Sequence, residues 1–224
     1  MSEARSIKAA IVDHRLGNLY SVKLACEHVG MQAEVTDDPA AILAAEVVIL
    51  PGVGAYEDAM LALDEFGLSK VLHEAAARGI PLVGICLGMQ LLMTESFEFG
   101  HHLGLGLIEG QVLPFENPRS ADGHILKVPQ VGWNRIHRPA AANWENTFLN
   151  GVSDQEYMYF VHSFYVKPAS PDVMLAATTY GEIEFCSSLG RGNIFATQFH
   201  PERSGLQGIQ IYKNIAAFCQ AARN

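Results

Sequence analysis

The sequence predicts an α/β protein: a single domain with a central, mostly parallel sheet flanked by helices, plus a smaller antiparallel sheet. Two observations predict this class. Through the first hundred residues, short and continuous apolar runs alternate with helical patterns, as expected for parallel strands that are covered on both faces. After Ser96, Gly, Pro, Asn and His become frequent and the apolar runs shorten, which indicates antiparallel strands.

Four strands are predicted in the first half of the chain, at residues 7–12, 32–36, 47–50 and 82–85. Each is a buried-type apolar run bounded by polar or turn residues. The helices between them carry their own start and stop signals. Asn18 is expected to cap a helix that runs to about Val29, and Gly30 to end it. A longer helical pattern over residues 57–78 is expected to break near Gly67.

The second half is predicted to contain strands at residues 111–113, 158–164, 173–179 and 193–199, followed by a helix over about 208–222. No internal repeat and no low-complexity tract interrupts the chain. No segment is rich enough in Ser, Gly or Pro to act as a linker between two domains. We therefore expect one domain over residues 1–224.

Composition narrows the class of function. The 224 residues are 49% hydrophobic and 17% charged, with a formal net charge of −9. Without a cluster of Lys and Arg, neither nucleic acid nor an anionic membrane surface is an expected partner. No apolar stretch is long enough to cross a bilayer, and no secretory signal is present, so a cytoplasmic location is expected. The four cysteines lack the spacing of a zinc site, and no metal is expected.

The segment GICLG at residues 84–88 contains the main candidate for a nucleophile, Cys86. A cysteine at the end of an apolar strand is usually a small buried hydrophobic residue. Here, however, the strand runs directly into a helix, and Gly84 and Gly88 flank the cysteine. Such a sharp turn lifts a nucleophilic side chain above the sheet edge, and the glycines remove Cβ atoms that would collide with neighbouring elements.

The helix that follows Cys86 would assist a nucleophile. Leu87 would offer its backbone N–H at the positive end of the helix, where an oxyanion is stabilised. The same helix end favours the thiolate form of Cys86. Gln90 lies one helical turn further on and is expected to face the same side, where it would bind substrate or simply be exposed.

A general base is expected at His200, which directly follows the apolar run NIFATQF. Of the other histidines, two lie in helical patterns (His28 and His73) and four in loop-like sequence (His101, His102, His124 and His137). His14 follows the first strand, where it would either approach the site or, more commonly, have a role in the loop. Pro201 disfavours helical geometry for His200, so residues 200–202 are expected to be extended. Glu202 would then point the same way as His200 and orient its ring. By itself an H-P-E segment is more often a surface turn. It becomes a catalytic candidate here because the chain also contains the G-x-C-x-G segment.

These segments resemble the class I glutamine amidotransferases, through GICLGMQ at 84–90 and QFHPE at 198–202. Within that superfamily the chain is most similar to the glutaminase subunits of imidazole glycerol phosphate synthases. The similarity is carried by PGVG at 51–54, KVPQVGWN at 127–134, YFVHSF at 159–164 and QFHPERSG at 198–205. DHRLGN at 13–18 also resembles these subunits, although a tyrosine and a small residue are more usual at His14 and Arg15.

The resemblance implies a glutaminase that releases ammonia from L-glutamine through a Cys86 thioester, with His200 as the proton carrier and Glu202 as its orienting group. It also implies a partner, a (β/α)8-barrel cyclase subunit that uses the ammonia to form an imidazole ring in histidine biosynthesis. This chemistry needs no cofactor, and the chain has no P-loop and no dinucleotide-binding fingerprint.

The resemblance further implies the residues that handle substrate. Leu87 and Val53 would supply the two oxyanion N–H groups, and Gly52 and Gly54 would let the backbone approach the substrate. Glutamine itself would be held by Gln90, Ser163 and Phe164. Taken alone, PGVG is equally a plain turn after a strand, and YFVHSF an ordinary aromatic strand.

Five residues match positions that lie near the cyclase in this family: Asn18, Gln130, Trp133, Asn134 and Arg203. Tryptophan and arginine are common anchors of protein interfaces. Trp133 is equally compatible with a place in the core, with its indole N–H bonded to a neighbour.

Three other functions remain open at this point. The first is another glutaminase of the superfamily, such as that of pyridoxal phosphate synthase, which KVPQVGWN and YFVHSF disfavour. The second is a stand-alone cysteine hydrolase. The third is a catalytically silent subunit with a regulatory or scaffolding role, which the presence of Cys86, His200 and Glu202 disfavours.

Overall fold

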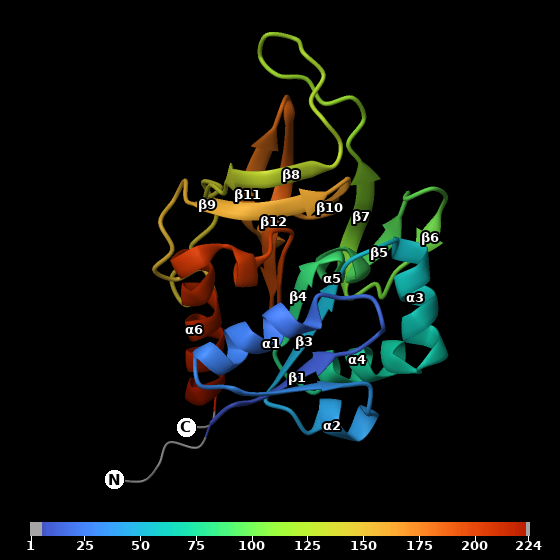
Figure 1. Ribbon diagram of the computed structural model, residues 1–224, viewed down its shortest axis with the longest axis vertical. Coiled ribbons are helices and arrows are strands. Elements are labelled where there is room, and N and C mark those ends of the chain that lie inside the picture. Colours follow the sequence, from blue (N-terminus) through green and yellow to red (C-terminus); the bar gives the residue numbers. More distant parts are fainter. Residues whose placement is uncertain (1–5, 223–224) are drawn as a thin grey trace.

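A computed structural model describes residues 6–222 and contains a mixed sheet of eleven strands and a separate antiparallel pair (Figure 1). The described chain has the predicted class: helices flank a sheet whose central strands are parallel, and a small antiparallel sheet lies beside it.

The parallel part has the strand order β2-β1-β3-β4-β13. Its strands are β1 (Lys8–Val12), β2 (Gln32–Thr36), β3 (Val47–Gly52), β4 (Leu82–Cys86) and β13 (Ile194–Thr197). The four strands predicted in the first half are therefore present, and β3 is two residues longer than predicted. The strand predicted at 193–199 is shorter than expected, because only Ile194–Thr197 pair with neighbouring strands. Because these strands are parallel, their carboxyl ends meet at one edge of the sheet, where open α/β sheets bind ligands.

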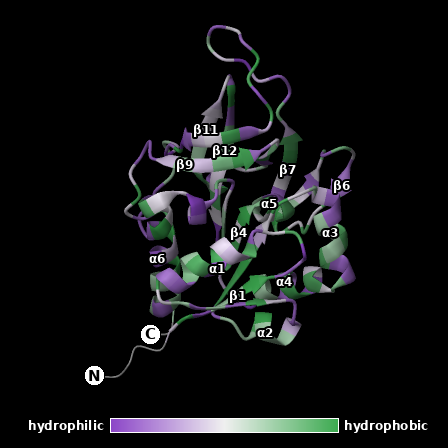
Figure 2. Cartoon of the chain, in the orientation of Figure 1, coloured by the Kyte–Doolittle hydropathy of each residue, from purple (hydrophilic) through white to green (hydrophobic). Residues whose placement is uncertain are grey.

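Helices cover both faces of these strands. One face packs against α1 (Leu19–His28) and α6 (Gly205–Ala221), and the other against α2 (Pro39–Leu43), α3 (Tyr56–Glu65), α4 (Leu68–Ala77) and α5 (Leu87–Leu91). Successive residues of one strand enter different cores: Ile49 joins the first core, whereas Val48 and Leu50 join the second. Burial on both faces explains why the strands are continuous apolar runs, which Figure 2 shows along β1 and β4.

Antiparallel strands extend the same sheet beyond β13. In order these are β12 (Ile183–Arg191), β10 (Phe164–Pro168), β7 (Ile108–Pro114), β5 (Met93–Ser96) and β6 (His102–Leu103), with β5 and β7 parallel to each other. β11 (Met174–Tyr180), preceded by the 3₁₀ turn η1 (Pro171–Val173), pairs with β12. The separate pair consists of β8 (Gln130–Arg135) and β9 (Tyr157–His162).

One predicted strand is in fact two. The run at 158–164 divides at Ser163: β9 pairs with β8 in the small sheet, and β10 pairs with β7 and β12 in the large one. The run contains neither Gly nor Pro, so its local pattern carries no sign of the break. The break is set by the two sheets that the segment joins, and it places Ser163 between them.

The helical predictions need smaller corrections. The pattern at 57–78 forms α3 and α4, separated at Gly67, whose φ of +69° suits glycine. Asn18 occupies the N-cap position of α1 but makes no side-chain capping bond. α2 was not predicted, although Asp38 caps it through the N–H groups of Ala40 and Ala41. α6 begins at Gly205, three residues earlier than predicted.

The turn from β4 into α5 positions Cys86. A Cβ on Gly88 would lie 1.8 Å from the carbonyl oxygen of Leu50 in β3, and one on Gly84 would lie 3.0 Å from the Gly88 carbonyl. Cys86 itself has φ 56° and ψ −111°, a conformation that costs a non-glycine residue roughly 1–3 kcal/mol. The two glycines let α5 begin at once and lie against the sheet, and this packing holds Cys86 in its strained position.

This arrangement predicts that Gly88→Ala lowers the free energy of unfolding by about 3 kcal/mol or more, because the obstructing atom belongs to the backbone and cannot turn aside. Gly30→Ala is the control: Gly30 has φ +84° with open space around it, and its loss should cost only about 1 kcal/mol. Urea unfolding of both variants measures the difference. Equal destabilisation of the two would contradict the packing role of Gly88.

Candidate active site

The candidate site lies at the carboxyl edge of β3, β4 and β13, which brings three predicted segments together. Gly52 at the end of β3 is paired with Cys86 at the end of β4, and Ile85 is paired with Thr197 at the end of β13. His200 follows three residues after Thr197. Segments that are far apart in the sequence thus meet at this edge because their strands are neighbours.

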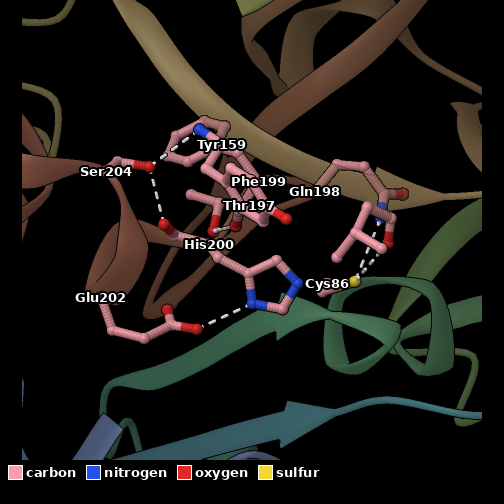
Figure 3. A network of polar contacts seen from close by, with 9 residues as sticks. Cys86, Tyr159, Thr197, Gln198, Phe199, His200, Glu202 and Ser204 are labelled. Atoms are coloured by element: carbon pink, nitrogen blue, oxygen red, sulfur yellow. Dashed lines mark hydrogen bonds and ion pairs between the residues drawn. The ribbon is translucent and has the colours of Figure 1, made fainter. Parts of the chain in front are cut away.

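Cys86, His200 and Glu202 are adjacent at this edge (Figure 3). The ring of His200 donates its Nδ1–H to Glu202 Oε1 over 2.7 Å, and both side chains are buried. The other ring nitrogen, Nε2, lies on the side that faces Cys86 and has no other hydrogen-bond partner among the described residues. The sulfur of Cys86 is largely buried, at the edge of a cavity.

The path from His200 to Glu202 differs from the prediction. His200 is extended, as Pro201 requires, but Pro201–Arg203 forms the 3₁₀ turn η2 instead of continuing as an extended segment. The Glu202 carboxylate therefore reaches the imidazole by curling back over one turn. The backbone N–H of His200 donates to the Tyr159 carbonyl, and the His200 carbonyl accepts the Ser204 hydroxyl, which holds the turn in place.

The surroundings of His200 favour its protonated form. Burial lowers the pKa of His200, but the negative charge and hydrogen bonding of Cys86, together with the Glu202 carboxylate, outweigh burial and raise the pKa to about 10. An imidazolium at His200 is therefore stabilised by negative charge on the Cys86 sulfur. This is the charge state that a cysteine nucleophile needs.

A cavity of about 530 Å³ opens beside the sulfur. Its walls include most of the predicted site residues, namely Val53, Gly54, Cys86, Leu87, Gln90, Ser163 and Phe164. Gly52 is not part of the wall. A Cβ at Gly52 would lie 2.9 Å from Leu87 Cβ, so this glycine is required for close packing between β3 and α5.

The two predicted oxyanion donors differ in this structure. Leu87 is the first residue of α5, so its N–H has no acceptor within the helix and lies at the cavity wall. The N–H of Val53 instead donates to the carbonyl of Leu16, at 3.2 Å. A substrate oxyanion would gain this second donor only after the Val53 N–H leaves Leu16.

His162 lies beneath the Ser163–Phe164 segment as a buried, neutral residue. Its Nδ1–H donates to the Phe164 carbonyl at 2.8 Å, and its ring packs among Phe115, Phe160 and Phe185. Burial lowers the pKa of His162 to about 4. It supports the loop and is not a base.

Two residues near the site were not found from the sequence. Glu98 lines the cavity, and its carboxylate accepts the N–H of Tyr56 at the start of α3; burial raises the pKa of Glu98. Gln198 is fully buried, and its side-chain N–H approaches the Cys86 sulfur at 3.7 Å. Gln198 lies inside QFHPE, so the motif contained the signal. Glu98 lies in a loop-like stretch with no local signal.

His14 lies in the connection between β1 and α1, as expected, but its side chain points into the protein. It is fully buried, and its Nε2–H donates to the Pro51 carbonyl at 2.7 Å, next to the Gly52–Gly54 turn. The neighbouring Arg15 lies at the surface, where its guanidinium pairs with Asp13 and Asp37.

The five residues predicted to lie near a partner do not form one surface. Trp133 is 56% exposed, so the alternative of a core position is wrong. It contacts the Tyr159 ring, over which the Arg203 guanidinium also lies, 4.6 Å from the ring centroid. Gln130 and Asn134 alternate with Trp133 along β8 and face inward; Gln130 is buried, and Asn134 donates to the Thr179 carbonyl. Asn18 belongs to neither strand of this pair and lies at the start of α1.

Between residues 6 and 222, no set of three or more His, Cys, Asp and Glu side chains is placed to hold a metal ion. Over the same span, none of the helices has the length and apolar character to cross a membrane.

Comparison with known proteins agrees with this geometry. The family model described as "Glutamine amidotransferase class-I" matches residues 6–217. "Imidazole glycerol phosphate synthase subunit HisH" of Syntrophotalea carbinolica is 46% identical over 207 residues, covering 92% of this chain and 97% of the relative. The protein of the same description from Geobacter metallireducens is also 46% identical, over 210 residues, covering 92% and 96%.

Solved structures share the fold at low identity. PurLQS from Thermotoga maritima aligns with a TM-score of 0.72 at 21% identity, covering 96% of this chain and 99% of that one. The glutaminase domain of Trypanosoma brucei CTPS, with bound acivicin, aligns with a TM-score of 0.62 at 15% identity, covering 98% and 95%. With a family model that spans nearly the whole described chain and relatives of this identity, the chain belongs to the class I glutamine amidotransferase family.

Proposed function

We propose that this chain is the glutaminase subunit of an imidazole glycerol phosphate synthase, which hydrolyses L-glutamine to glutamate and ammonia for use by a cyclase subunit in histidine biosynthesis. One observation carries the glutaminase activity: the bond from His200 to Glu202 orients a buried imidazole toward a cysteine held at a strained turn. The assignment to this particular synthase is supported by the relatives that are 46% identical to the chain.

The first chemical step is attack on the side-chain amide of glutamine. The Cys86 thiolate adds to the amide carbon, and the carbonyl oxygen takes the negative charge. His200 then gives its Nε2 proton to the amide nitrogen, the C–N bond breaks, and ammonia leaves a thioester on Cys86. The neutral ring next takes a proton from water, which attacks the thioester and releases glutamate. Glu202 holds the ring in one orientation through both steps.

The oxyanion formed in both steps needs N–H donors at the cavity wall. Leu87 supplies one at the start of α5. Val53 supplies the second after its peptide turns away from Leu16. Gly52 and Gly54 flank Val53, and Gly54 has φ +109°, so the segment has the freedom that this rotation requires.

Glutamine would bind with its α-carboxylate and α-ammonium groups away from the sulfur. The backbone of Ser163 and Phe164 lines that part of the cavity and would receive the carboxylate. Gln90 uses its N–H groups on Phe164 and Gln198, so its Oε1 is left to accept from the ammonium group. Glu98 supplies a negative charge in the same cavity.

The cyclase would dock on the outer face of the β8–β9 pair, which we define as Val131, Trp133, Arg135, Tyr157 and Tyr159. Apart from the half-buried Tyr159 these side chains are exposed, and three of the five are aromatic. Val161, the next outward residue along β9, lines the cavity beside Cys86. A partner on this face would therefore abut the site and could receive ammonia before it reaches bulk water.

Cys86→Ala tests the nucleophile. Glutamine hydrolysis should fall by roughly 10⁴-fold or more, because no other group can form the thioester. The complex with the cyclase should still use free ammonia, since the cyclase does not need the sulfur. Glutamate release and ammonia-dependent turnover measure the two activities. Loss of both would mean that Cys86 has a structural role.

The charge pair predicts an unusual titration of His200. In the wild-type protein its ring should stay protonated well above pH 7, with the change near pH 10. The stabilisation of the folded protein by this proton is complete below about pH 6.5 and is lost as the pH rises through about 10. In Cys86→Ala the titration should move to lower pH, because the burial that disfavours the charge remains. NMR of the ring nitrogens follows both; identical titrations would contradict the pair.

Trp133→Ala tests the docking face. Affinity for the cyclase should fall by about 30-fold, as for an aromatic anchor at an interface. The isolated chain should keep its stability, because the side chain is already 56% exposed. Leu61→Ala on α3 is the matched control, since Leu61 is 61% exposed and lies outside the docking face. Isothermal titration calorimetry distinguishes the two; equal affinities would place the cyclase elsewhere.

A further inference from the structure

Gln198 lies where it can contact the reacting atom, yet the mechanism above gives it no part. Its side chain is fully buried one residue after β13, between the end of that strand and Cys86. Its Nε2 is 3.7 Å from the Cys86 sulfur (Figure 3). Its Oε1 accepts the Gln90 Nε2–H at 3.0 Å.

The surrounding bonds permit only one orientation of this amide. Gln90 must present its NH₂ group to the Phe164 carbonyl, 3.0 Å away, because that carbonyl is only an acceptor. The same NH₂ group meets Gln198, which must therefore present its oxygen to Gln90. That leaves the NH₂ group of Gln198 on the side of the sulfur. A single backbone carbonyl at Phe164 thus orients two glutamines in succession.

This orientation selects the charged form of the nucleophile. A thiolate accepts an N–H hydrogen bond more strongly than a neutral thiol does. On its other side, the sulfur lies 3.7 Å from the Val161 carbonyl, which accepts only from a protonated thiol. The sulfur therefore has one neighbour that favours each form, and when the proton moves to His200 the N–H of Gln198 remains as the donor.

We propose that Gln198 is a further catalytic residue, whose side-chain N–H stabilises the Cys86 thiolate, and that Gln90 is the positioning residue that orients it. When His200 takes the thiol proton, the electron pair left on sulfur accepts the Gln198 N–H until that pair forms the bond to the amide carbon. The Phe164 carbonyl belongs to the segment that would receive glutamine, so the substrate-binding wall and the nucleophile are joined by one chain of hydrogen bonds. The role rests on the proposed glutaminase function.

The test uses alkylation of Cys86 by iodoacetamide, because this reaction reports the thiolate and needs neither glutamine nor a partner. Mass spectrometry of the Cys86 peptide gives the rate as a function of pH. In Gln198→Met, which keeps the size and removes the donor, the rate at pH 7 should fall by about 10-fold and its profile should move to higher pH. In the complex with the cyclase, kcat for glutamine should fall by a similar factor while KM stays within about 2-fold.

Two further variants test the same contact in other ways. In Gln198→Glu, alkylation should be slower than in Gln198→Met at pH 7, where a carboxylate repels the thiolate, and should recover toward lower pH as the carboxyl gains a proton. In Gln90→Met, Gln198 loses its orienting bond, and the alkylation profile should move in the same direction as in Gln198→Met. Near-UV circular dichroism shows which variants remain folded.

Ser188→Ala is the matched control. Ser188 is fully buried on β12, and its hydroxyl donates to the Ala196 carbonyl of β13, so its loss also removes a buried hydrogen bond from this region. Its alkylation profile should equal that of the wild type. Unchanged profiles in folded Gln198→Met and Gln90→Met would overturn the proposal. Failure of the wild-type complex to release glutamate would instead reject the glutaminase function and leave the alkylation result intact.

Discussion

The close approach of α5 to β3 is the constraint on which the site depends. Gly88 lies against the Leu50 carbonyl with no room for a side chain, so the chain can turn from β4 into a helix within a single residue. That residue is Cys86, and its strained φ and ψ angles are held by packing on both sides of the turn. The same turn places the Leu87 N–H at the cavity wall. One turn therefore positions both the candidate nucleophile and one proposed oxyanion donor.

Burial strengthens the interaction between the charged groups of Glu202 and His200 at this edge of the sheet. Glu202 and His200 are almost wholly removed from water, so each needs the other: an isolated buried charge would be costly, whereas the bonded pair orients the ring. Burial lowers the pKa of both histidines, but His162 has no carboxylate partner among the described residues and stays neutral. The two buried histidines therefore differ in protonation because of their surroundings: His200 lies beside a carboxylate, whereas His162 lies among aromatic rings.

The hydrogen bonds from Phe164 through Gln90 and Gln198 connect the two halves of the large sheet. Phe164 begins β10 in the antiparallel part, whereas Gln90 and Gln198 follow strands of the parallel part. The cavity lies across this junction, and the β8–β9 pair borders it. The proposed substrate-binding wall, the proposed thiolate donor and the proposed docking face therefore meet where the parallel and antiparallel strands join.

The central strands and the residues of the candidate triad could be predicted from local residue patterns. Continuous apolar runs between helices indicate strands buried on both faces. The G-x-C-x-G segment has the pattern of a nucleophile turn, and it made the H-P-E segment a candidate partner. Three features could be seen only in the folded chain: the division of residues 158–164 between two sheets, the bond from the Val53 N–H to the Leu16 carbonyl, and the inward direction of Gln130 and Asn134. Contacts such as that of Gln90 with Gln198 join residues 108 positions apart. Such contacts depend on which strands become neighbours, and local residue patterns do not encode that choice.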